Sequence, residues 1–161
     1  MYQPILGTLG YVLSPDKQNV LLVNRNRRLD DPHYGKYNGL GGKMDAHEDI
    51  VQGMKREIFE EAGIMCHSIR LRGTVNWPGF GPNGQHWLGF VFLIEAYGGE
   101  PYQCNEEGDL VWAPLHKIHT LPMWEGDKYF LPLVFDQNPE VFHALIPYDQ
   151  GKPVSFSYTR A

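Results

Sequence analysis

Three glutamates near the middle of the chain, Glu57, Glu60 and Glu61, have the type and spacing to bind a metal ion. On a helix they fall within a sector of about 100°, so their carboxylates point the same way. The mutual repulsion at i, i+4 and the helix dipole in the last turn both oppose this arrangement, and a cation would offset both. Carboxylate oxygens suit a hard cation such as Mg²⁺, whereas zinc would require nearby Cys or His ligands. Taken alone, the three residues fit a solvated acidic helix face equally well.

A helix is expected to carry these carboxylates. Asp49 and Gln52 form a capping box at its start, and Gly63 is a natural C-terminal stop. Between them an apolar stripe at i, i+3, i+7 and i+11 marks the buried face, formed by Val51, Met54, Ile58 and Ala62. The carboxylate of Glu57 is then expected to face solvent.

The flanking segments predict strands around this helix. Apolar runs predict strands at residues 6–13, 20–23, 68–75, 87–96 and 110–113. A basic polar loop is expected at 24–36, and a second helix at 129–135, with Pro132 in its first turn, or at 139–142. Strands at 141–146 and 153–158 are the alternative for the end of the chain. We therefore expect one mixed α/β domain over residues 1–161.

Composition and charge exclude several classes of protein. The 161 residues are 42% hydrophobic and carry a net charge of −5, which favours a folded domain and gives duplex nucleic acid no basic surface. Divalent cations could still bring a polyanionic small molecule to such a chain. Cys66 and Cys104 are too few for a disulfide framework, and no segment resembles a signal peptide or a membrane span. A soluble cytoplasmic protein, as monomer or homodimer, is expected.

The segment 42–64 resembles the Nudix box, G-x₅-E-x₇-R-E-U-x-E-E-x-G-U with U aliphatic. The fixed positions are all matched: Gly42, Glu48, Arg56, Glu57, Ile58, Glu60, Glu61, Gly63 and Ile64. Chance matches in a chain of this length are expected on the order of 10⁻⁷ times. The resemblance implies the Nudix fold, a mixed sheet in an α/β/α sandwich, and hydrolysis of a nucleoside diphosphate linked to another group.

The resemblance also implies roles for individual residues. Mg²⁺, with Mn²⁺ as a substitute, would be held by the carboxylates of Glu57, Glu60 and Glu61, called the box carboxylates here, and by a backbone carbonyl near Gly41. Arg56 would orient the carboxylates and Glu48 would brace the loop. Glu57 is the first candidate for catalytic base, and Glu107, a loop carboxylate near the metal, is the second. The glycine loop at Gly42, together with Lys43 and Arg25, would contact the phosphates.

Beyond the box, the chain resembles the MutT-homologue branch that hydrolyses oxidised purine nucleoside triphosphates such as 8-oxo-dGTP. The resemblance rests on GTLGYVLSP, YNGLGGK, PMWEGDKYFLPL and VFHALIPYDQGKPVSFSYTR. In a W-x-D-D segment of that branch the Trp stacks on the base and the carboxyls pair with its edge. The corresponding pocket here would comprise Trp124, Asp127, Asn38 and Thr8. The first Asp is replaced by Gly126, with Glu125 beside it, and this leaves the preferred base open.

The expected function is nucleotide-pool sanitation, by Mg²⁺-dependent hydrolysis of a nucleoside triphosphate to a monophosphate and pyrophosphate. A nucleotide sugar or ADP-ribose is the alternative substrate, and a non-catalytic module that binds nucleotides or RNA is the alternative class. The strand QHWLGFVFLIEA and the loop WPGFGPNG are expected to line the same cleft. Their aromatic residues Trp77, Phe80 and Trp87 are interpreted as core or loop packing rather than as base platforms.

Overall fold

An eight-stranded mixed sheet forms the centre of the computed structural model, which describes residues 1–161. The strands follow the order β10-β7-β4-β5-β1-β2-β3, and β6 pairs with β2. The bounds are β1 (Ile5–Leu13), β2 (Asn19–Asn24), β3 (Tyr37–Asn38), β4 (Met65–Trp77), β5 (Trp87–Gly98), β6 (Asp109–Pro114), β7 (Phe142–Leu145) and β10 (Ser157–Arg160). The pairs β1–β5 and β4–β7 are parallel, and the other pairs are antiparallel. A separate hairpin consists of β8 (Tyr148–Asp149) and β9 (Lys152–Pro153).

The five predicted strands between residues 6 and 113 are all present. Each extends past at least one of its predicted ends, because pairing with a neighbour continues after the apolar run stops. In β4, for example, Met65 and Cys66 pair with Gly98 and Tyr97 of β5. The predicted strand at 153–158 is only partly correct, since the residues between β9 and β10 are not in a strand.

The helix α1 (Ile50–Ala62) begins and ends where its caps predict. The side chain of Asp49 accepts from the backbone N–H groups of Val51 and Gln52, Gln52 completes the capping box, and Gly63 has a φ of 72°. Met54, Ile58 and Ala62 are fully buried. Val51 in the first turn is 37% exposed, so the buried stripe begins one turn later than expected.

The second helix, α2, spans Glu125–Phe135 and begins four residues earlier than predicted. Pro132 therefore lies inside this helix and not in its first turn. The helix expected at 139–142 is wrong: residues 139–141 lie in a loop, and β7 begins at Phe142, where it pairs in parallel with β4 and antiparallel with β10. The end of α2 is bound by the buried guanidinium of Arg72. This group donates to the carbonyl of Val134 at 3.0 Å and to the carboxylate of Asp136 at 3.1 Å.

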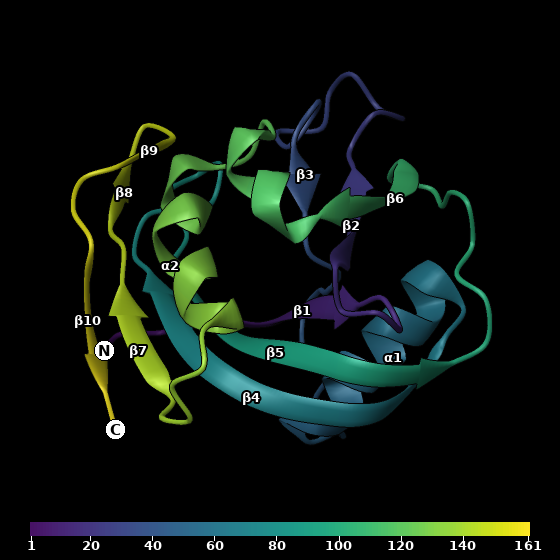
Figure 1. Ribbon diagram of the computed structural model, residues 1–161. Coiled ribbons are helices and arrows are strands. Elements are labelled where there is room, and N and C mark those ends of the chain that lie inside the picture. The colour runs from purple at the N-terminus through teal and green to yellow at the C-terminus, as the bar shows by residue number, and fades with distance from the viewer.

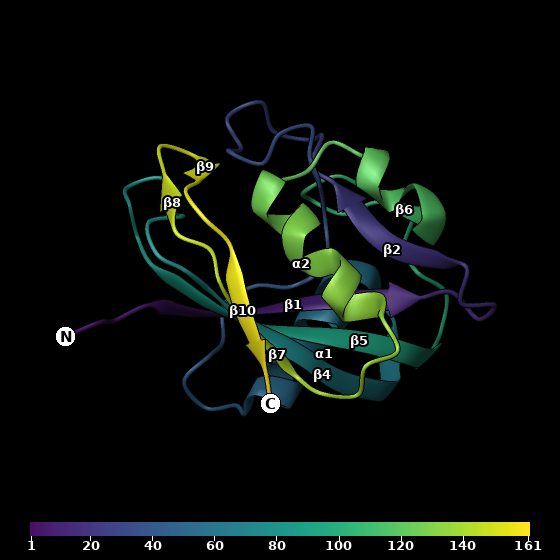
Figure 2. The same ribbon diagram turned by 60° about the vertical axis from the view of Figure 1, so that its left-hand side comes forward.

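The two helices cover opposite faces of the sheet (Figure 1, Figure 2), with a short 3₁₀ helix, η1 (Leu115–Thr120), following β6. Each face of the sheet carries its own hydrophobic core, and alternate residues of β5 belong to different cores. Val91 and Leu93 pack with α2, whereas Phe92 and Ile94 pack with α1. Burial on both faces is the reason that the central strands read as continuous apolar runs. The expected α/β/α sandwich is confirmed. Neither α1 nor α2 has the length and hydropathy needed to cross a membrane.

Candidate active site

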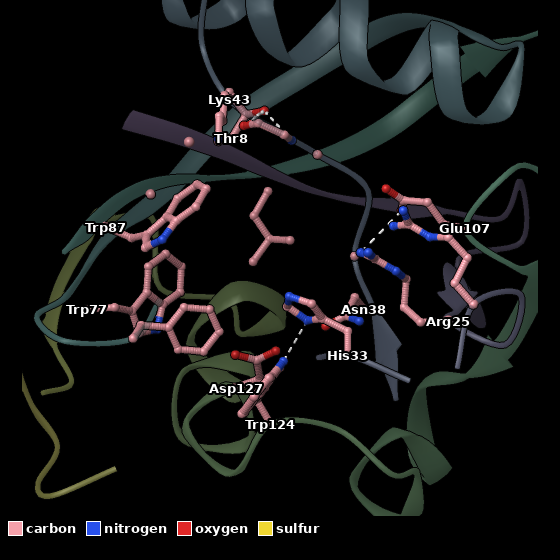
Figure 3. A pocket seen from close by; sticks show the side chains of 18 residues that line it. Thr8, Arg25, His33, Asn38, Lys43, Trp77, Trp87, Glu107, Trp124 and Asp127 are labelled. Atoms are coloured by element: carbon pink, nitrogen blue, oxygen red, sulfur yellow. Dashed lines mark hydrogen bonds and ion pairs between the residues drawn. The ribbon is translucent and has the colours of Figure 1, made fainter. Parts of the chain in front are cut away.

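A cavity of about 610 Å³ opens between the glycine loop that follows β3, the start of α2 and the ends of β4 and β5 (Figure 3). Every residue expected to bind substrate lines this cavity, namely Thr8, Arg25, Asn38, Gly42, Lys43, Trp124 and Asp127. Gly41 and Glu107 line it as well. Segments that are far apart in the sequence therefore meet around one space, as the sequence analysis expects.

The glycine loop lies directly against β1. The backbone N–H of Thr8 donates to the carbonyl of Gly42 at 2.8 Å, and the N–H of Gly42 lies 3.3 Å from the Thr8 hydroxyl. A Cβ on Gly41 would lie 1.9 Å from the carbonyl oxygen of Thr8, so only glycine fits there. This close approach fixes the loop between β1 and α1.

Arg56 connects the loop with the carboxylates of α1. Its guanidinium donates to both oxygens of Glu48, at 2.8 and 2.7 Å, and to Glu57 and Glu60 at 2.9 and 3.2 Å. Glu48 also accepts from the backbone N–H of Asp45 at 2.8 Å. Arg56 first, and then this N–H, lower the pKa of Glu48 to about 2. Arg56 is thus in contact with the carboxylate of Glu57, and Glu48 joins Arg56 to the loop at Asp45.

The box carboxylates differ in their exposure. Glu60 is largely exposed, but the side chain of Glu57 is only 15% exposed, so the expectation that Glu57 faces solvent is wrong. Its carboxylate lies beneath Gly42, where an added Cβ would come within 2.6 Å of it. Burial raises the pKa of Glu57, and burial together with the charges of Glu107 and Glu57 raises the pKa of Glu61 to about 9.

These carboxylates form a donor set that fits a hard divalent cation. They are oxygen ligands, as such cations prefer, and Glu57, Glu61 and Glu107 disfavour one another's charge, which a cation would offset. In this structure the side chains do not converge into a ready-made cluster of three or more metal ligands. Glu57 is instead paired with Arg56, and Glu61 accepts from the backbone N–H of Gly41 at 3.3 Å.

Arg25 and Glu107 form an ion pair on the cavity wall, with 3.3 Å between Nη1 and Oε2. Arg25 also donates from Nε to the buried Asp31 at 2.8 Å. The expected phosphate partner is thus already held by two carboxylates. Lys43 is exposed and unpaired, and its ammonium lies 5.9 Å from the centre of the Trp87 ring.

The opposite end of the cavity carries Trp124, Asp127 and Asn38 (Figure 3). The carboxyl of Asp127 makes no hydrogen bond within the protein, and burial raises its pKa to about 7. The amide nitrogen of Asn38 is buried without a partner. Buried polar groups normally have partners, so these two are available to a ligand.

Gly126 has no room for the carboxylate found at this position in the W-x-D-D pattern. It is buried and donates its N–H to the hydroxyl of Tyr148 at 3.0 Å, and an added Cβ would lie 2.5 Å from that hydroxyl. Glu125 is exposed and does not line the cavity, so it does not replace the missing group. This end of the cavity therefore offers one carboxyl.

The segments expected to line the cleft do so: Trp77, Phe80 and Trp87 lie on the cavity wall, and all three also pack in or against the core. Phe80 packs edge-on against Trp124, with ring centres 5.0 Å apart. The aromatic residues of the β4–β5 loop were a usable signal in the sequence. His33 also lines the cavity, and nothing in its neighbourhood along the chain indicates this.

Comparisons with known proteins show the family of this chain. The chain is 33% identical over 107 residues to the uncharacterized Nudix hydrolase YvcI of Bacillus subtilis, covering 64% of this chain and 66% of that protein. It is 30% identical over 152 residues to the oxidized purine nucleoside triphosphate hydrolase of Mus musculus, covering 94% and 92%. The MutT mutator protein from Bacillus halodurans superposes with a TM-score of 0.82 at 26% identity, covering 96% and 97%. Since the model of the NUDIX domain matches residues 4–134, the chain belongs to the Nudix hydrolase family.

Proposed function

We propose that this hydrolase cleaves oxidised purine nucleoside triphosphates, such as 8-oxo-dGTP, to the monophosphate and pyrophosphate. The observation that carries the proposal is the continuity of one cavity, which has glycine-loop amides and basic side chains at one end and an aromatic wall with free hydrogen-bonding groups at the other. A triphosphate and a flat base require these two environments. The name of the mouse relative supports the same substrate class.

At the phosphate end, Glu57, Glu60 and Glu61 would hold Mg²⁺, together with Glu107 and the backbone carbonyl of Gly41. Nudix hydrolases generally need a divalent ion, and the all-oxygen donor set favours Mg²⁺, with Mn²⁺ as a substitute. When bound, the cation would polarise the phosphate oxygens and lower the pKa of the attacking water.

The protein's own groups would position that water and the phosphates. Glu57, partly buried beneath the glycine loop, is the proposed general base, and Glu107 is the second candidate. Arg56 keeps the carboxylate of Glu57 in place through its 2.9 Å contact. Lys43, which has no carboxylate partner, would bind a phosphate, and Arg25 would do so on release from Glu107.

At the base end, the ring of Trp124 would stack on the purine, while Asp127 and Asn38 pair with its edge. Thr8 lies at the other end of the cavity, where its hydroxyl contacts Gly42 of the glycine loop. Asp127→Asn should therefore change the preference among purine triphosphates more than the overall rate. Unchanged preference would remove Asp127 from the pocket.

The test is pyrophosphate release from a panel of substrates in the presence of Mg²⁺. We expect kcat/KM to be highest for an oxidised purine triphosphate and activity to disappear on chelation of the metal. A nucleotide sugar or ADP-ribose that is cleaved much faster than every triphosphate would overturn the substrate assignment. Nucleotide binding without hydrolysis of any member of the panel would overturn the catalytic assignment.

A further inference from the structure

His33 lies on a loop that is held firmly over the cavity. Sequence analysis places it in an exposed basic loop at 24–36, yet Asp31 at the centre of this loop is only 8% exposed. The carboxylate of Asp31 accepts from Arg25 Nε at 2.8 Å and from the backbone N–H of His33 at 3.0 Å. The backbone N–H of Lys36 in turn donates to the carbonyl of His33 at 2.9 Å. These contacts fix the backbone on both sides of the imidazole.

The imidazole of His33 holds the indole of Trp124. The indole Nε1–H donates to His33 Nδ1 at 2.7 Å, and the two rings meet edge to face with centres 5.3 Å apart. Lys36 places its ammonium 4.5 Å from the centre of the indole ring, and Phe80 packs against its edge. Trp124 is therefore fixed by three neighbours, of which His33 is the only one that accepts the hydrogen of its nitrogen.

This hydrogen bond also determines the tautomer of the imidazole. Indole nitrogen is a donor only, so Nδ1 of His33 must carry no hydrogen, and a neutral imidazole then carries its proton on Nε2. Burial and the charge of Arg25 lower the pKa of His33 to about 4, so the ring is neutral near pH 7. Nε2–H has no hydrogen-bond partner in the protein, and Figure 3 shows the ring on the cavity wall between Asn38 and Trp124.

The base end of the cavity thus presents unpaired N–H donors and a single carboxyl. The donors include Nε2–H of His33, the buried amide nitrogen of Asn38 and the buried indole nitrogen of Trp77, and the carboxyl is that of Asp127. A second carboxyl is absent because Tyr148 occupies its space beside Gly126. A 6-oxopurine offers an acceptor at O6 to such donors, whether or not C8 is oxidised, whereas a 6-aminopurine presents an amino donor in place of O6.

We propose that His33 is a specificity-determining residue, which fixes the Trp124 indole through Nδ1 and donates Nε2–H to an acceptor on the base, so that the enzyme prefers 6-oxopurine to 6-aminopurine triphosphates. The inference rests on the proposed function, because it names the class of base within that substrate group. It assigns two separable tasks to the two nitrogens of one ring.

Two variants separate these tasks. In His33→Asn the side-chain oxygen can replace Nδ1 as acceptor for Trp124, but no group reaches the position of Nε2. In His33→Gln the amide can replace the Nε2–H donor, but the acceptor near the indole is lost. His116→Asn, an exposed histidine outside the cavity, is the matched control.

The kinetic readout is kcat/KM for dGTP, 8-oxo-dGTP and dITP against dATP and 2-hydroxy-dATP. We expect the wild type to favour the 6-oxopurines, and His33→Asn to reduce that preference about tenfold, mainly through KM, since one hydrogen bond is lost. His33→Gln should keep the preference while weakening all purines together, and His116→Asn should match the wild type. A wild-type preference for 6-aminopurines, or an unchanged preference in His33→Asn, would overturn the inference.

The structural readout does not depend on catalysis. The indole N–H resonance of Trp124, assigned by its loss in Trp124→Phe, should lie downfield in the ¹H–¹⁵N spectrum of the wild type and of His33→Asn, and move upfield in His33→Gln. An unmoved resonance in His33→Gln would contradict the positioning task. If the wild type hydrolyses no triphosphate, the proposed function fails, and calorimetric binding of dGTP against dATP, with the same variants, decides the inference about His33.

Discussion

Replacing Asp127 by asparagine should stabilise the protein at high pH and leave its stability unchanged at low pH. Burial raises the pKa of Asp127 from its ordinary value of 3.8 to about 7, so the folded state binds a proton that the unfolded state has already released. The stability of the wild type therefore falls as the pH rises through the interval from about 4 to about 7. An asparagine does not ionise, so this loss disappears in the variant.

The magnitude follows from the size of the shift. About three pKa units correspond to about 4 kcal/mol of stability lost above pH 7. Two effects reduce this value: the side chain is partly exposed to the cavity, and Asp127 lies in the first turn of α2, where the helix dipole favours a negative charge by about 0.3–1 kcal/mol. We therefore expect a gain of about 2 kcal/mol for Asp127→Asn at pH 8, which is roughly 4–8 °C in Tm.

Urea and thermal unfolding at pH 3.5 and pH 8, without nucleotide or metal, measure this difference. Glu125→Gln is the matched control, because Glu125 is an exposed acid in the same helical turn and its replacement should not stabilise the protein at pH 8. An Asp127→Asn variant that is no more stable than the wild type at pH 8, or equally stabilised at both, would refute the argument that Asp127 is desolvated at the base of the cavity.

The remaining predictions concern the catalytic and structural contacts. Glu57→Gln should lower kcat by about 10²–10⁴-fold with an unchanged circular dichroism spectrum, as measured by pyrophosphate release; retained turnover would exclude Glu57 as the base. Gly126→Ala should cost about 1–3 kcal/mol in urea unfolding, because its Cβ would lie 2.5 Å from the Tyr148 hydroxyl. Most of that cost should vanish in a Tyr148→Phe background, and equal costs in both backgrounds would show that the hydroxyl is not the obstacle. Arg72→Met should cost about 3–5 kcal/mol in the same assay, since it removes the buried donor of several backbone carbonyls in and just after the last turn of α2, while Asp136 keeps Arg160 as its partner; a cost under about 1 kcal/mol would contradict this.

The proposed substrate class and the base preference attributed to His33 depend on different features of the same cavity. The first depends on the cavity joining a phosphate end with a flat base end, and the second depends on which polar atoms of the base end remain unpaired. A change at His33 should therefore alter the choice of base without abolishing hydrolysis, whereas a change at Glu57 should abolish hydrolysis for every base.

The sequence alone determined the features that depend on residues close together in the chain. The capping box at Asp49, the stop at Gly63 and the spacing of the box carboxylates act within one helix and the loop before it, so local chemistry is sufficient to place them. The apolar runs of β1 and β5 likewise predict central strands. The family resemblance then indicated which distant residues share a cavity, and the structure brings all seven of the expected substrate-binding residues to it.

Only the tertiary structure decided how the base end of that cavity is built. His33 meets Trp124 across 91 positions of sequence, and Tyr148 closes the space beside Gly126 across 22. The burial of Glu57 under Gly42, and of Asp127 at the start of α2, also arises from segments that meet only after the sheet has formed. Such contacts depend on where each loop lies over the sheet. No sequence pattern within a few residues of His33 or Tyr148 predicts the position of its loop, because packing brings together side chains that are far apart in the chain.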